Sequence, residues 1–183
     1  MTFNSQTIIP EIRAEFNSLI EFVTNEQALT ATADQIERGL FRRMLHLGAQ
    51  LLTLFFVMRS QASSREPLQT MAGRRMLYQR ESKRNYVSIF GKIAIWRPYF
   101  YQSGVGSAYP LDAELSLGQD SYSDLVREIC EYLGIYSIYH KTTEILERLL
   151  GLRLSTRVMQ QVIASDAADV ETYYAQKPAP AVD

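Results

Sequence analysis

Residues 89–101, IFGKIAIWRPYFY, decide how the middle of the chain folds. From about Met76 onward, apolar side chains alternate with others at a period of two, and the alternation resumes at Ile93 and Ile95. A period of two is that of a β-strand, and Gly91 between the two runs supplies the turn. The sequence therefore predicts a β-hairpin over about residues 76–101. Pro98 has no amide hydrogen for a ladder, so the second strand should be an edge strand or end there.

The predicted hairpin is strongly basic, although the whole chain of 183 residues carries a formal net charge of only −1. Between Arg74 and Arg97 there are seven basic residues and one acid, Glu81, which gives a local charge of +6. Any argument for a nucleic-acid partner must therefore rest on this local charge and not on the overall balance.

Helical periodicity flanks the hairpin on its N-terminal side. Within residues 32–61, apolar side chains recur at steps of three and four: Ile36, Leu40, Met44, Leu47, Leu51, Leu54 and Met58. This spacing predicts one long helix, with Thr32 and Gln35 as a capping box and Pro67 beyond its end. A shorter helix is predicted upstream, around Phe16 and Leu19. The two helices either form a hairpin or pair with a second copy.

Three further helices are predicted after the loop at residues 102–109. Ser121 or Ser123 caps the first, which Gly134 closes; Ser137 caps the second, with Gly151 just past its end; Ser155 caps the third. We expect a mainly α fold with a central β-hairpin (α+β). Its parts would be a helical segment at 1–70, the basic hairpin and a PLD loop at 71–118, a helix-turn-helix-like domain at 119–175, and a disordered tail at 176–183.

The sequence does not contain the residues that several classes of function require. One cysteine, Cys130, excludes an internal disulfide, and two distant histidines do not make a metal site. His140 has no nucleophile or carboxylate partner, and no phosphate-binding loop is present, so we predict no catalytic residue, no metal and no cofactor. The N-terminus lacks a secretory signal, and the apolar run at residues 51–58 is too short to cross a bilayer. We expect a cytoplasmic protein with no membrane partner, and that apolar run should be a buried turn of helix.

The last two predicted helices have the spacing of a helix-turn-helix. If so, the final helix would enter the major groove of double-stranded DNA with Arg157, Gln160 and Gln161 outward, near Arg153 in the turn. Arginine and glutamine match the edges of guanine and adenine. An ordinary helical hairpin with a solvated polar face fits the pattern as well, and Asp166 and the acids after it argue against DNA there.

The basic hairpin offers a second candidate surface. Its cations would follow phosphates, while Trp96 and the aromatic residues after Pro98 pack or stack; the cations are Arg80, Lys83, Arg84, Lys92 and Arg97. The alternative is that the aromatic side chains belong to the core and that the charges are an ordinary solvated face.

The order of these motifs resembles the N-terminal region of Kra-type insertion-sequence transposases. The motifs are IFGKI with Arg97 and Tyr99, then YPLD at residues 109–112 with Leu115, then residues 137–151 and LSTRV at residues 154–158. The resemblance covers about residues 84–168. It implies a DNA-binding front end that recognises the terminal repeats of the element, ahead of a catalytic domain with a metal-bound acidic triad.

Two departures from the family pattern matter. The first catalytic aspartate would follow the helical segment, but the chain ends at Asp183, so no catalytic residue is carried over and we expect no enzyme activity of its own. Many relatives have Cys-x-x-Cys between hairpin and PLD, where Tyr101 and Gly104 stand here, so a zinc knuckle is ruled out. Tyr99, Phe100 and Tyr101 should then be mainly structural.

The rival hypothesis is that the long helix self-associates, or docks on an intact transposase, without binding DNA.

Overall fold

The computed structural model describes residues 5–176, with side chains up to residue 167. Over this range the fold is mixed α+β, as predicted. It has six α-helices and a four-stranded antiparallel sheet, whereas the sequence predicted five helices and the central hairpin alone. The chain divides into two compact units, Met1–Ser123 and Asp124–Asp183. Apart from Gln176, the last residue of a helix, the tail expected at 176–183 lies outside the described residues.

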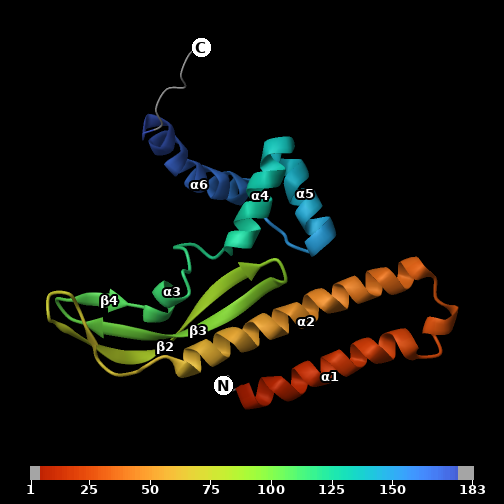
Figure 1. The fold of residues 1–183 in the computed structure, drawn as a ribbon, viewed down its shortest axis with the longest axis horizontal. Helices are drawn as coiled ribbons and strands as arrows, with labels where there is room; N and C mark the ends of the chain where they lie inside the picture. Colours follow the sequence, from red (N-terminus) through yellow and green to blue (C-terminus); the bar gives the residue numbers. More distant parts are fainter. Residues whose placement is uncertain (1–4, 177–183) are drawn as a thin grey trace, which may run out of the picture. The chain divides into compact units, whose positions relative to one another are not determined.

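The first unit begins with two antiparallel helices, α1 (Ser5–Thr24) and α2 (Ala33–Ala62), which lie side by side in Figure 1. The predicted capping box of α2 is confirmed: the Gln35 amide donates to the Thr32 hydroxyl, and the Gln35 side chain accepts from the Thr32 amide. Gly39 lets the helices approach closely, because a Cβ there would stand 2.2 Å from the Phe22 ring. Of the two predicted arrangements, the chain adopts the helical hairpin.

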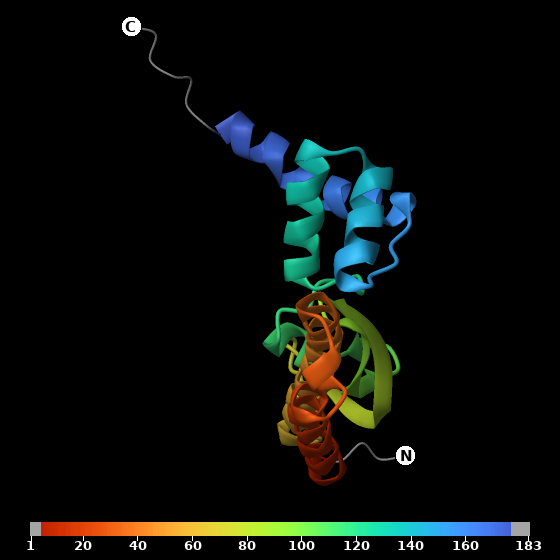
Figure 2. The same cartoon turned by 90° about the vertical axis from the view of Figure 1, so that its right-hand side faces the viewer.

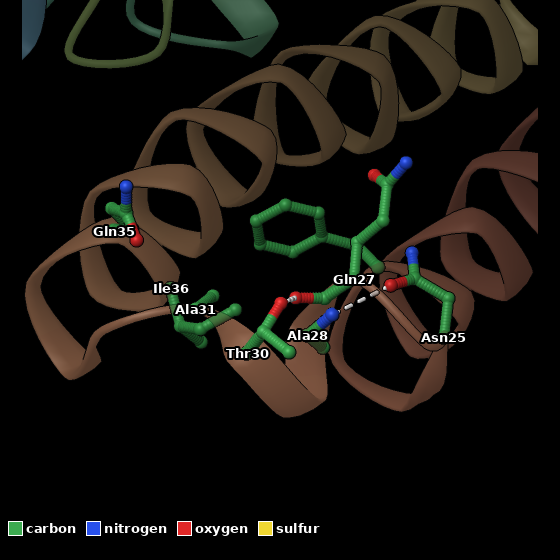
Figure 3. Close-up of a pocket in the computed structure, with 8 residues that line it drawn as sticks. Asn25, Gln27, Ala28, Thr30, Ala31, Gln35 and Ile36 are labelled. Atoms are coloured by element: carbon green, nitrogen blue, oxygen red, sulfur yellow. Dashed lines mark hydrogen bonds between the residues drawn. The ribbon is translucent and has the colours of Figure 1, made fainter.

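A short 3₁₀ turn, η1 (Ala28–Thr30), joins the two helices and borders a pocket of about 410 Å³ (Figure 3). The amide of Ala28 donates to Asn25 Oδ1 over 2.8 Å, and the Thr30 hydroxyl donates to the Gln27 carbonyl. These bonds lie within residues 25–30 and hold the connecting turn in shape. No charged side chain lines the pocket, so we assign it to the turn and not to a site.

The predicted hairpin forms the centre of the sheet. β2 (Arg75–Ser88) and β3 (Gly91–Gln102) pair over nearly their whole length, and the outer strands are β1 (Leu68–Gln69) and β4 (Gly106–Ala108). The connection is the two-residue loop at residues 89–90, and Gly91 follows it with a φ of +115°. A bulge between Tyr78 and Arg80 accommodates one extra residue in β2.

Of the two alternatives predicted for β3, the strand does not end near Pro98, but at Pro98 it is an edge, paired on one side only. Pro98 is buried and pairs with Glu81 of β2, and β3 runs on to Gln102. β4 pairs with β3 only from Phe100 to Gln102, so the side of β3 that Pro98 leaves without a donor has no partner strand at that point.

The core of the first unit joins α2 to the sheet. Phe56 of α2 packs with Ile93 and Ile95 of β3, and Gly48 lies so close to the Phe90 ring that a Cβ would stand 2.5 Å away. The helical segment and the basic hairpin, expected as separate parts, thus share one hydrophobic core, and the unit extends to Ser123.

Much of the apolar surface of α2 is not covered. Phe56 and Val57 are buried as predicted for the run at residues 51–58, but Leu51, Phe55 and Met58 are about half exposed. Among the described helices, α2 alone is long and apolar enough to cross a membrane, which is weak evidence because helices of water-soluble proteins pass the same test.

The second unit holds three helices, α4 (Asp124–Tyr136), α5 (Tyr139–Leu150) and α6 (Thr156–Gln176). Figure 2 shows α4 and α5 side by side, with α6 crossing both. Ser155 caps α6 as predicted, accepting from the Val158 amide over 3.3 Å. Gly151 ends α5 in the left-handed conformation, with a φ of +68°.

Two predicted boundaries in this unit were wrong. Gly134 does not end α4, which continues to Tyr136; a Cβ at Gly134 would stand 2.6 Å from Ile163 Cδ1, so the glycine serves close packing of α4 against α6. Ser137 does not cap α5 either: the N-cap is Ile138, which makes no capping hydrogen bond through its side chain.

Candidate nucleic-acid interface

Two of the predicted phosphate-contacting arginines meet at one carboxylate. Asp112 lies on α3 (Pro110–Glu114), a short helix that begins with a proline, in the PLD segment expected to be a loop. Arg84 Nη1 donates to Asp112 Oδ2 over 2.9 Å, and Arg97 Nη1 contacts the same oxygen. The three side chains are only 11%, 12% and 20% exposed for Arg84, Arg97 and Asp112.

Further contacts fix both arginines in place. Arg84 Nη2 also donates to the carbonyls of Gly118 and Asp120, and the Arg97 guanidinium lies 3.8 Å from the centre of the Tyr109 ring. Burial, together with the neighbouring Arg84 cation, lowers the pKa of Arg97 from its usual value. The two arginines thus anchor residues 109–120 on the sheet. Because they offer little surface to a ligand, we no longer place them among the phosphate contacts.

Three of the predicted hairpin cations remain exposed, Arg80, Lys83 and Lys92, and they lie on two faces. Lys83 pairs with Trp96, and Lys92 pairs with Val87. Since side chains alternate along a strand, this register puts Lys83 and Lys92 on one face of the sheet. Arg80 pairs with Tyr99, on the opposite face with Arg84 and Arg97, and its guanidinium is 5.8 Å from the Tyr99 ring centre.

The neighbouring arginines Arg74 and Arg75 are exposed as well, and the site prediction left them out. Arg74 Nη1 donates over 2.8 Å to the carbonyl of Gly104, in the turn between β3 and β4. The sequence could have indicated Arg74 and Arg75 as candidate phosphate contacts, since they begin the stretch whose net charge is +6. They extend the exposed basic surface toward the sheet end that carries β4.

The turn between β3 and β4 follows Tyr101 and contains Gly104. Gly104 and Gly106 there have positive φ values, and Tyr101 pairs with Ser107 across the two strands. Phe100 is buried against Tyr78, and Tyr99 stacks on Tyr109 at 5.1 Å, whereas Tyr101 is 44% exposed. Backbone pairing and packing of the first two aromatic rings thus shape this end of the sheet.

The predicted base-reading residues lie together on α6. Arg157, Gln160 and Gln161 are exposed at helical spacings of three and four, while Met159 and Val162 on the other side of the helix are buried. The exposed row is therefore the outward face of α6, opposite the side that packs on α4 and α5. Arg153, in the preceding turn, is exposed and makes a surface ion pair with Glu147, 2.7 Å from Nε to Oε1.

The acid expected to repel DNA near this row is engaged within the unit. Both carboxylate oxygens of Asp166, on α6, accept hydrogen bonds from Nη1 of Arg127, on α4, over 2.7 and 2.9 Å. Burial alone would raise the pKa of Asp166, but hydrogen bonds with Glu131 and Arg127 outweigh it and lower that pKa. The hydrogen bond to Asp166, followed by burial, raises the pKa of Glu131. Arg127 therefore offsets the charge of Asp166.

The structure offers little for other chemistry. Among the described residues, no three His, Cys, Asp or Glu side chains gather in a way that could hold a metal ion. Cys130 is buried, and burial raises the pKa of its thiol to about 11. His140 is exposed at the start of α5. Two apolar grooves lie between helices, one between α4 and α5 and one between α1 and α2.

Comparisons of the chain with protein-family models, with curated protein sequences and with solved structures found no match.

Proposed function

We propose that this chain is the DNA-binding N-terminal portion of a Kra-type insertion-sequence transposase, and that it recognises the terminal repeats of the element in double-stranded DNA. The observation that carries the proposal is the outward row Arg157, Gln160 and Gln161 on α6, which follows a turn opened by the left-handed Gly151. Arginine and glutamine can each make paired hydrogen bonds to base edges in the major groove.

The resemblance on which the proposal draws involves residues that lie together in the fold. Arg97 belongs to the motif with Tyr99, and Tyr109 and Asp112 belong to YPLD; the three form one buried cluster with Arg84. A cluster of this kind gives these motifs a structural reason to occur together. In the proposed role the chain has no catalytic residue, needs no metal or cofactor, and acts in the cytoplasm.

The proposal divides the candidate residues into two groups. Arg157, Gln160 and Gln161 read bases, and Arg153 supports them from the turn. Lys83 and Lys92, on one face of the sheet, contact phosphates, as does Arg80 from the other face. Base contacts carry sequence preference, whereas phosphate contacts carry affinity that salt weakens.

The first test is fluorescence anisotropy of the full chain with a duplex from a terminal repeat of the element and with a scrambled duplex, over a series of salt concentrations. The expected result is tighter binding to the repeat, with affinity that falls steeply as salt rises. Equal binding to both duplexes would remove end recognition, and no binding at low salt would overturn the proposal.

Variants separate the two groups of residues. Arg157→Ala should weaken binding to the repeat by about 1–3 kcal/mol and leave the scrambled duplex almost unaffected. The matched control is Arg38→Ala, which removes the same charge from an exposed surface pair on α2. An equal loss on both duplexes would make Arg157 a phosphate contact. Replacing Lys83 and Lys92 together should lower the salt slope by about 2 on either duplex.

A further inference from the structure

The two N-terminal helices expose a continuous apolar face. Eight large side chains on them each leave between 39% and 60% of their area exposed: Phe16, Ile20 and Val23 of α1, and Phe41, Met44, Leu51, Phe55 and Met58 of α2. We call this the two-helix face. Single exposed apolar residues are ordinary on proteins, but a patch of this size marks a contact surface.

The face is a third side of α2, distinct from the two that are already covered. One side of α2 packs on the sheet through Ala49, Leu52 and Phe56. Another meets α1, where Gly39 contacts the Phe22 ring and Arg43 donates to Ser18. Figure 1 accordingly shows α2 between α1 and the sheet.

A groove joins the parts of the face that the two helices contribute. It has a volume of about 330 Å³, and it is lined by Ile12, Phe16, Leu47 and Leu51, with Arg13 and Asn17 at its edge. Phe16 and Leu51 both line this groove, so these two members of the face lie on the same side of the helical hairpin. The hairpin therefore presents the apolar half of a four-helix bundle.

We infer that a second copy of this chain covers the two-helix face, so that two helical hairpins form a four-helix bundle. Eight large side chains that are each about half exposed present on the order of 800 Å². That area is what one partner contributes to a stable interface of standard size.

Charge favours a second copy as the occupant. Within its described bounds, α1 has three glutamates and one arginine, a net charge of −2. α2 has two acids and four arginines, and because Arg59 pairs with Glu114 of α3, it keeps a net charge of +1 for a partner. A two-fold axis that lays α1 of one copy on α2 of the other brings opposite charges together, and it does so twice. A hairpin with these helices is thus complementary to itself.

The inference does not depend on DNA binding, and its test measures mass. Sedimentation equilibrium of the full chain, without DNA, should give twice the monomer mass of 21.0 kDa at micromolar concentration. The double variant Met44→Glu and Phe55→Glu puts two charges into the face and should weaken the dimer at least about 100-fold. Both side chains are exposed in the single copy, so the variant should keep its fold, which the fluorescence of Trp96 reports.

A matched control distinguishes this face from other apolar surfaces. Leu149 on α5 is 58% exposed beside the groove between α4 and α5, so Leu149→Glu makes a similar change in the other unit. It should leave the dimer intact. A wild-type chain that stays monomeric at about 100 µM would overturn the inference, as would a dimer that Leu149→Glu breaks and the double variant does not. Binding of the wild-type chain to phosphatidylcholine vesicles, lost in the double variant, would assign the face to lipid and equally overturn it.

Discussion

Replacement of Asp112 by asparagine should destabilise the first unit strongly. The carboxylate of Asp112 contacts both Arg84 and Arg97, and all three side chains are at least 80% buried. Asparagine keeps the shape and one acceptor oxygen, but it cannot balance two buried cations. Removing one partner of a buried ion pair costs about 3–5 kcal/mol.

The structure sets the magnitude within that range. Arg84 keeps the carbonyl oxygens of Gly118 and Asp120 as acceptors, so its loss is partial. Arg97 keeps the Tyr109 ring. We therefore expect a loss at the lower end, about 3 kcal/mol in the free energy of unfolding. For a unit of this size that corresponds to a fall of about 10 °C in melting temperature.

The assay is urea unfolding followed by tryptophan fluorescence. Trp96, in β3, is the only tryptophan of the chain, so its signal reports the first unit and not the second. The control is Glu114→Gln on the same short helix. Its pair with Arg59 is 48% and 43% exposed, and it should change stability by less than about 0.5 kcal/mol. Equal small effects of both substitutions would refute the assignment of Arg84 and Arg97 to an anchoring role.

Three further predictions concern the second unit. Because the hydrogen bond to Asp166, followed by burial, raises the pKa of Glu131, the contribution of this group to stability is complete below the ordinary pKa of 4.5 and is lost as pH rises through the raised pKa. Glu131→Gln should abolish this loss in melts followed by circular dichroism. Gly151→Ala should cost about 1 kcal/mol in the same melts because of the positive φ, and Gly151→Asn should cost less. The buried Cys130 thiol, with its pKa near 11, should react with a thiol reagent at least about 100-fold faster in urea than in the native chain.

Features that depend on neighbouring residues were predicted well from the sequence. The capping box at Thr32 and Gln35, the cap at Ser155 and the left-handed Gly151 each involve groups within a few residues of one another. The alternation around Gly91 likewise gave the hairpin. These signals are local, since both partners of each hydrogen bond belong to one turn of chain.

Features that depend on distant partners were missed. β1 and β4 are two and three residues long, too short for any periodicity, and they exist because β2 and β3 offer them an edge. Gly134 gave the same local signal as Gly151, but it lies inside α4 because Ile163 of another helix packs on it. The half-exposed Met44, Leu51 and Met58 share the period of the buried residues, so the pattern could not separate a core side from an uncovered one.

The hairpin cations show why the net charge of a sequence segment overestimates the number of residues that can contact DNA. Five hairpin cations were predicted to contact phosphates, but Asp112 holds Arg84 and Arg97, which leaves Arg80, Lys83 and Lys92. Each phosphate contact on duplex DNA adds about 0.9 to the slope of affinity against salt, so five contacts would contribute about 4.5 and three about 2.7. The difference arises from one carboxylate that lies fifteen positions after Arg97 in the chain. The salt slope of the proposed complex therefore measures how many hairpin cations contact phosphates and how many form ion pairs within the fold instead.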